Sequence, residues 1–185
     1  MKEKLYTIPL MDAFKAGDEC PFCFVERQLE QHAMDFVLGA GASYMEDDVR
    51  AETDKMGFCR THYKKMYDYG NRLGTGLILK THFQYKTKEL HEQIRIFAPS
   101  RASVFSRFKK GNTDTDAPKT SLGAWVKEQE DTCYICNFYK DTYARYLDTF
   151  FELFKKSQEF LPLFETCKGF CIPHFGDLVE TAESA

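Results

Sequence analysis

Apolar residues recur at helical spacing along most of the chain. In residues 20–38 they follow one another at steps of three and four, and residues 134–156 carry a second, wider stripe rich in aromatic side chains. Such spacing places the apolar side chains on one face of a helix, which then packs against a core. We therefore predict a helix over each range, and we interpret the aromatic stripes as core rather than as a cofactor site.

Shorter helical patterns lie between and around these two segments. They predict helices over residues 8–16, from Ser43 to Gly57, from Arg60 to Phe97, from Ser121, over 158–168 and from Cys171. Gly70, Gly74 and Gly76 lie inside the longest helical pattern, where they mark either a bend or the close approach of another helix. Ser43 and Glu46 form a capping-box pattern. Because no stretch alternates in the manner of a strand, the predicted fold class is all-α.

One motif occurs twice along the chain. A Cys-x-x-Cys pair is followed by Gly-Phe-Cys-x-x-His, and the first copy supplies Cys20, Cys23, Cys59 and His62. The second copy supplies Cys133, Cys136, Cys171 and His174. From the pair to the third cysteine there are 59−23 = 36 positions in the first copy and 171−136 = 35 in the second. Matched spacing of scarce residues indicates an internal duplication, and it predicts a pseudo-duplicated helical protein with each half clamped by a Cys3His metal site.

Each copy offers three thiols and one imidazole, the donor set of a closed tetrahedral zinc site. Two residues at i and i+3 in the first turn of a helix lie on one side of it, and the free N–H groups there stabilise thiolates. We predict two structural zinc ions, each bound within one repeat. An iron–sulfur cluster and unliganded buried thiols are alternatives, as is a cross-repeat site made of Cys20, Cys23, Cys171 and His174.

The segment Cys20-Pro21-Phe22-Cys23 also has the form of a thiol oxidoreductase motif. That motif works at the end of a strand in a βαβ unit, whereas a helix is predicted before it here. A zinc-linked thiol redox sensor remains an alternative function. The seventh cysteine, Cys167, is interpreted as a packed thiol, and three histidines have no partner at a ligand spacing: His32, His82 and His91.

Charge and apolar content limit the partners. The formal net charge is −3, and no apolar run approaches the ~20 residues of a membrane span. The first residues lack the apolar core of a signal peptide, so we expect the cytoplasm, where paired cysteines are more often metal ligands than disulfides. Residues 95–110 are basic, so a nucleic-acid-binding protein that uses this segment is an alternative function. We interpret the segment as solvated instead.

Composition also suggests a division of the chain. Residues 98–120 are rich in Pro, Gly, Ser, Thr and Asp and lack periodicity, which predicts a mobile linker. We therefore expect a first Cys3His repeat over 1–97 and a second over 121–185, and one compact domain that contains both repeats is the alternative. The helix after His62 is longer than the one after His174.

Several stretches together resemble a domain-of-unknown-function family of bacterial proteins, found mainly in Clostridia-like anaerobes. They are the opening 4–9, the Cys-Pro-Phe-Cys segment, residues 44–53 and Gly57-Phe58-Cys59-Arg60-Thr61-His62. The resemblance covers nearly the whole chain and implies both Cys/His sets, and many members continue past the position where this chain ends. It implies no activity.

No nucleophile–base pair, phosphate-binding loop or open metal position emerges from the sequence. We therefore expect a non-enzymatic interaction or regulatory module with a protein partner, and not an enzyme. The aromatic residues beside the motifs, Phe22, Phe58, Phe138 and Phe170, should keep water from the thiolates.

Overall fold

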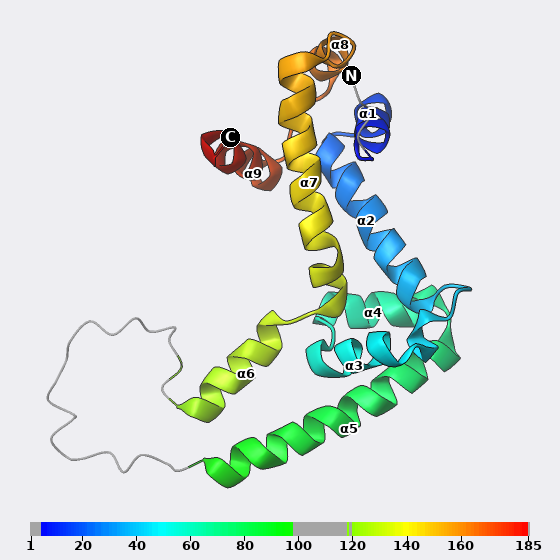
Figure 1. The fold of residues 1–185 in the computed structure, drawn as a ribbon, viewed down its shortest axis with the longest axis vertical. Helices are drawn as coiled ribbons and strands as arrows, with labels where there is room; N and C mark the ends of the chain where they lie inside the picture. The colour runs from blue at the N-terminus through cyan, green and yellow to red at the C-terminus, as the bar shows by residue number, and fades with distance from the viewer. Residues whose placement is uncertain (1–4, 98–117, 119, 185) are drawn as a thin grey trace, which may run out of the picture. The chain divides into compact units, whose positions relative to one another are not determined.

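The structure, a computed structural model, describes residues 5–97, 118 and 120–184. Within these ranges the chain forms nine α-helices and one 3-10 helix, with no strand (Figure 1). The predicted all-α fold class is confirmed. None of the helices described is long and apolar enough to cross a membrane.

The chain packs as two compact units that are not consecutive halves. The first unit combines Met1–Phe36 with Ile135–Ala185, and the second is Val37–Tyr134. The boundaries expected at residues 97 and 121 divide the sequence repeats, not these compact units. They stay a prediction. The expected linker, 98–120, falls outside the described residues except for Pro118 and Thr120, and so does most of the basic segment 95–110.

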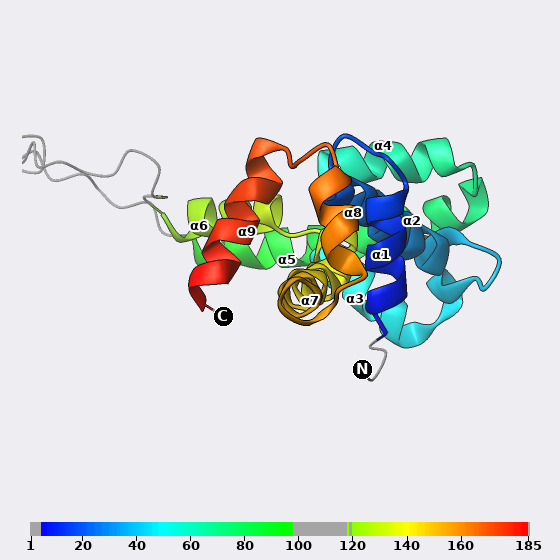
Figure 2. The ribbon, with the colours of Figure 1, turned by 90° about the horizontal axis from the view of Figure 1, so that it is seen from above.

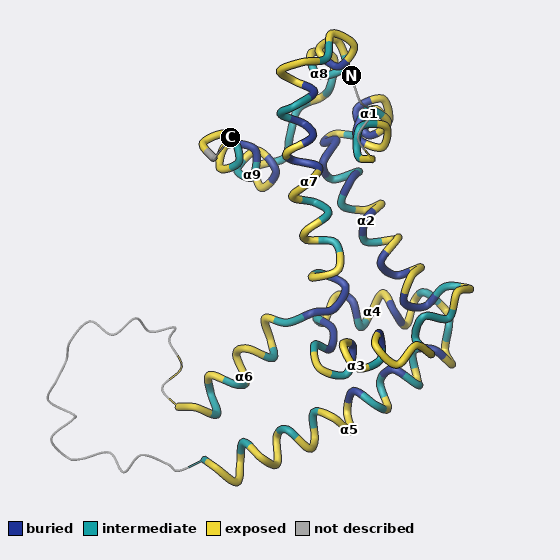
Figure 3. Tube along the Cα trace, viewed as in Figure 1, coloured by how far each residue is buried: buried dark blue, intermediate teal, exposed yellow. Residues whose placement is uncertain are grey.

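Five helices build the first unit: α1 (Thr7–Lys15), the greater part of α2 (Pro21–Leu38), α7 (Tyr134–Lys156), α8 (Phe160–Thr166) and α9 (Ile172–Ser184). α1 lies beside α8, as both views show (Figures 1 and 2). The buried positions of α2 and α7 form one core with those of α1 (Figure 3).

Aromatic rings fill the core of the first unit. Phe150 of α7 lies 5.8 Å from Phe22 of α2 and 5.7 Å from Phe160 of α8, between ring centroids. Phe14 of α1 closes the group, with its centroid 4.8 Å from that of Phe160. Full burial of such a side chain stabilises the fold by about 1.5–3 kcal/mol. The buried members of the stripe in residues 134–156, among them Tyr146 and Phe150, belong to the core as predicted, whereas Phe138 and Phe154 are exposed.

The second unit contains the 3-10 helix η1 (Ser43–Met45) and the helices α3 (Asp47–Met56), α4 (Arg60–Tyr69), α5 (Arg72–Ile96) and α6 (Ser121–Asp131). α3 packs along α5 (Figure 1). The capping box expected at Ser43 is not formed, because Ser43 lies in η1 and α3 begins only at Asp47. Arg50 joins the elements by donating to the carbonyl oxygens of Tyr44 and Leu77.

The long helix predicted from Arg60 to Phe97 is divided at Gly70. Gly70 adopts φ +91°, which ends α4, and Asn71 caps α5 by accepting from the Gly74 amide at 2.9 Å. The Asn71 side chain also donates to the carbonyl of Leu38 at 2.8 Å. Gly74 marks a close approach: a Cβ there would lie 2.9 Å from Cε1 of Tyr44. Both suggested roles of the glycines therefore occur, the bend at Gly70 and close packing at Gly74.

Candidate metal centres

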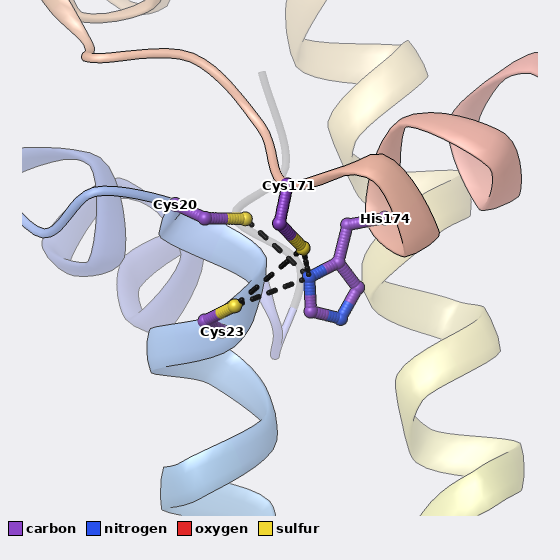
Figure 4. A group of neighbouring side chains, drawn as sticks. All are labelled: Cys20, Cys23, Cys171 and His174. Carbon is purple, nitrogen blue, oxygen red and sulfur yellow. Dashed lines mark hydrogen bonds between the residues drawn. The ribbon is translucent and has the colours of Figure 1, made fainter.

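The eight predicted ligands gather into two groups of four. The first cluster consists of Cys20, Cys23, Cys171 and His174 (Figure 4). The second cluster consists of Cys59, His62, Cys133 and Cys136. Within each cluster the ligand atoms all lie within 4.8 Å of one another. The prediction that each site forms within one repeat is therefore wrong, because each Cys-x-x-Cys pair meets the Cys-x-x-His of the other repeat.

Helix starts position the ligands. In each motif the first cysteine directly precedes a helix, and the second ligand lies one turn inside it. In the first cluster the carbonyl of Cys20 accepts from the amide of Phe24 at 3.3 Å, and that of Cys171 accepts from Phe175 at 2.9 Å. The starts of α2 and α9 thus point their side chains toward one another (Figure 4). Backbone N–H groups at such ends favour thiolates.

The spacing of the donor atoms in the first cluster fits one tetrahedral ion. With metal–sulfur and metal–nitrogen distances of about 2.3 Å and 2.0 Å, a tetrahedron has S···S edges of about 3.8 Å and S···N edges of about 3.5 Å. Sγ of Cys23 lies 3.7 Å from Sγ of Cys171. Nδ1 of His174 lies 3.4 Å from Sγ of Cys20 and of Cys23, and 3.0 Å from Sγ of Cys171. The residues present therefore fit a metal ion bound through Nδ1.

The electrostatics of the first cluster also suit a cation. Burial acts to raise the pKa of Cys20, but hydrogen bonds from the backbone of Cys171 and Cys23 and from His174 outweigh it and lower that pKa to about 7. For Cys23, burial and the neighbouring thiols raise the pKa to about 12. Thiols this close repel one another when ionised, so all three become thiolates only when a positive ion compensates their charge.

A second ring of contacts orients His174. Its Nε2 lies 3.1 Å from Oε2 of Glu26, one turn beyond Cys23 on α2, while its Nδ1 faces the sulfur atoms. A carboxylate on the outer nitrogen of a ligand histidine fixes the tautomer and the ring orientation. Tyr143 packs beside the imidazole, with centroids 5.9 Å apart, and donates to Oδ2 of Asp177 at 2.9 Å. Burial and that carboxylate raise the pKa of Tyr143, which keeps it a donor.

The second cluster is held by two short segments that hydrogen-bond to each other. The amide of Tyr134 donates to the carbonyl of Gly57 at 2.9 Å, and Oγ1 of Thr132 donates to the carbonyl of Met56 at 3.0 Å. These bonds fix Cys133 against Cys59, the N-cap residue of α4. Nδ1 of His62 lies 3.2 Å from the sulfur of each, so this imidazole also faces the thiols through Nδ1.

A family model described as "Family of unknown function (DUF6062)" matches residues 1–185. The chain belongs to this family. No curated protein and no solved structure matches it. The match confirms the resemblance to a family of unknown function, and the activity of this DUF6062 chain has to be inferred from its own residues.

Burial divides the eight ligands of the DUF6062 chain into inner and outer members. Cys20, Cys133 and both histidines are buried, whereas the other four cysteines are half-buried. Phe22 and Phe58 are buried as expected of residues that shield a site. Phe138 is exposed and stacks on Phe36 at 5.1 Å, so it does not provide the expected cover.

The seventh cysteine and the other three histidines lie outside both clusters. Cys167 is partly buried against the core of the first unit, as predicted for a packed thiol. His32 and His91 are exposed. His82 is buried in the second unit against the backbone of Gly57, a packed position rather than a ligand position. No local sequence signal marks that contact, because it joins α5 to the turn between α3 and α4.

Proposed function

We propose that the chain is a zinc protein in which each Cys3His cluster binds one structural ion. The match between the donor-atom distances of the first cluster and the edges of a zinc tetrahedron carries the proposal. Four protein donors complete the coordination, which leaves no position for a catalytic water. Soft thiolate donors with one imidazole select zinc over magnesium or calcium.

The same geometry favours a single ion over an iron–sulfur cluster. All four donor atoms of each group lie within 4.8 Å of one another and so converge on one point. An iron–sulfur cluster spreads its thiolates over several iron atoms, which requires a wider set of donors. We therefore assign the clusters to mononuclear zinc.

The ions act as clamps between distant parts of the chain. The first joins residues 154 positions apart, and the second joins residues 71 positions apart inside that loop. By analogy with a disulfide, a link over a loop of this length is worth about 4–5 kcal/mol of loop-closure entropy.

We further propose a non-enzymatic interaction or regulatory role in the cytoplasm, with a protein partner. Large apolar side chains on α9 remain exposed, among them Ile172 at 88% and Phe175 at 60%. Exposed apolar residues gathered on one element are typical of a protein-binding surface.

A thiol redox sensor is the second candidate, because Cys23 and Cys59 are only half-buried. The two functions differ in how readily the ions leave. Stoichiometric peroxide is added to the pure zinc-loaded protein, and released zinc is followed with a chromogenic chelator. A structural role predicts slow release with the unfolding temperature retained.

Rapid release that is reversed by a reductant would replace the structural proposal with the sensor. A Cys167→Ala variant is the control, because Cys167 lies outside both clusters. Its zinc should leave at the rate of the unaltered protein, so that release reports on the clusters alone.

A further inference from the structure

A cavity of about 650 Å³ lies wholly within the second unit. Its walls come from the end of α3, the start of α4, and facing turns of α5 and α6. Three aromatic residues are among those that line it: Phe58, Tyr63 and Trp125. The volume falls in the range of about 300–1,000 Å³ typical of small-molecule sites.

α6 turns one face toward this cavity. Trp125 and Val126 lie four and three positions before Gln129, about one helical turn, and all three residues line the cavity. No residue of α6 is fully buried, and Trp125, the chain's only tryptophan, is half-buried. An amphipathic helix ordinarily buries such a face in a core. Here the face borders open space large enough for a planar molecule.

Lys86 supplies a cation to the wall. Its side chain is only 17% exposed, and its ammonium donates to Oε2 of Glu89 at 2.7 Å and to Oε1 of Gln129 at 2.5 Å. An ammonium has three N–H donors, so one remains for a further acceptor. The bond to Gln129 also ties α5 to α6 across the cavity.

His82 supplies an acceptor. Its Nδ1 lies 2.9 Å from the backbone carbonyl of Asp54, which can only accept, so Nδ1 carries the proton. Nε2 of the neutral ring is then an acceptor. Gly57, with φ +64°, holds the ring closely: a Cβ there would lie 2.6 Å from Cε1 and 2.9 Å from Nε2 of His82. The imidazole lining the cavity is therefore fixed in orientation.

We propose that this cavity binds a small aromatic monocarboxylic acid that carries a hydroxyl or amino group. The ring packs among Phe58, Tyr63 and Trp125, the carboxylate accepts from Lys86, and the hydroxyl or amino group donates to His82.

Charge selects among anions. The two cations, Arg60 and Lys86, are balanced in formal charge by Glu130 on the wall and by Glu89 beside Lys86. This balance favours a monoanion over a phosphate, whose second charge the carboxylates repel. Because Cys59 also lines the cavity, the ligand lies beside the second cluster. The proposal goes beyond the structural role of the ions and holds for any metal that keeps the cluster closed.

The lone tryptophan provides the assay. The metal-loaded protein is titrated with 4-hydroxybenzoate while Trp125 fluorescence is recorded, and a saturable change is expected. The neutral 4-hydroxybenzamide, benzoate without the hydroxyl, and phenyl phosphate should each bind at least tenfold more weakly. Absence of any saturable change at millimolar concentrations overturns the site, and equal binding of the amide overturns the assignment to a carboxylate.

Two variants test the residues. Lys86→Gln should weaken 4-hydroxybenzoate at least tenfold, whereas Lys88→Gln, an exposed lysine on the same helix outside the cavity, should bind as the unaltered protein does. Val126→Phe fills the cavity without removing a polar group and should abolish the fluorescence change. Circular dichroism and metal content confirm that each variant is folded. Unchanged affinity in folded Lys86→Gln or Val126→Phe would contradict the proposal.

Discussion

Replacing Glu26 with alanine should weaken metal binding at the first cluster and leave the second cluster unchanged. The carboxylate lies 3.1 Å from Nε2 of His174, whose Nδ1 faces the three sulfur atoms. Removing it frees the imidazole to rotate and lowers its basicity, so that the ligand binds less well.

The size of the effect follows from the exposure of Glu26. Loss of such an outer partner typically costs 10–100-fold in metal affinity, about 1.4–2.7 kcal/mol. The side chain of Glu26 is 44% exposed, so water replaces part of the lost interaction. We expect a loss of about tenfold for Glu26→Ala and a smaller one for Glu26→Gln, whose amide oxygen still accepts a hydrogen bond.

Zinc displacement from the cobalt-loaded protein measures both clusters at once, because cobalt absorbance reports each tetrahedral thiolate site. The displacement curve should show one step for each cluster. In the Glu26 variants only the step of the first cluster should shift. Asp35→Asn, which removes the same charge from the other end of α2, is the control and should shift neither. Equal shifts of both steps would indicate a general charge effect, and no shift would refute the orienting role.

Three further predictions concern stability and pH. Phe150→Ala should cost about 3–5 kcal/mol by denaturant unfolding, because it empties a buried aromatic core position; a loss below 1 kcal/mol would contradict the packing described. Gly57→Ala should lower the free energy of unfolding by about 2–5 kcal/mol, because the φ of Gly57 is +64° and a Cβ there would meet His82. Gly76→Ala is the control: because the space around Gly76 is open, the substitution should leave the stability unchanged or stabilise α5. Acidification should release the ions, because protons compete with the metal for the ligands. The pKa of Cys20 is lowered to about 7, so its thiolate contributes to metal binding above that pH and is lost below it. The metal content after dialysis at about pH 5 should therefore fall.

The sequence was sufficient to predict most of the helices and to single out the eight residues of the two clusters. Periodicity located α2 and α7, and the motif spacing singled out the eight residues that the structure gathers into two groups. These features are local, because a helix face and an i, i+3 pair are defined within a few residues. The division at Gly70 was an open possibility, which the left-handed conformation of that glycine decides.

The pairing of the motifs could not be predicted in the same way. Every Cys-x-x-Cys can complete a tetrahedron with either Cys-x-x-His, so chemistry alone does not distinguish the two arrangements. Packing decides between them. Phe22 of α2 lies 6.0 Å from Phe170, beside Cys171, and the amide of Tyr134 bonds to Gly57, beside Cys59. Such contacts join residues more than 70 positions apart and leave no mark in a single sequence.

The metal content of paired variants tests the central claim, that two ions are bound and that each joins the two repeats. Elemental analysis of the unaltered protein should give two zinc ions per chain. Cys20→Ala with Cys171→Ala disables only the first cluster and should leave one ion, whereas Cys20→Ala with Cys59→Ala disables both clusters and should leave none. The reverse result, no ion with the first pair and one with the second, would show pairing within repeats, and reduced unaltered protein without metal would contradict the account as a whole.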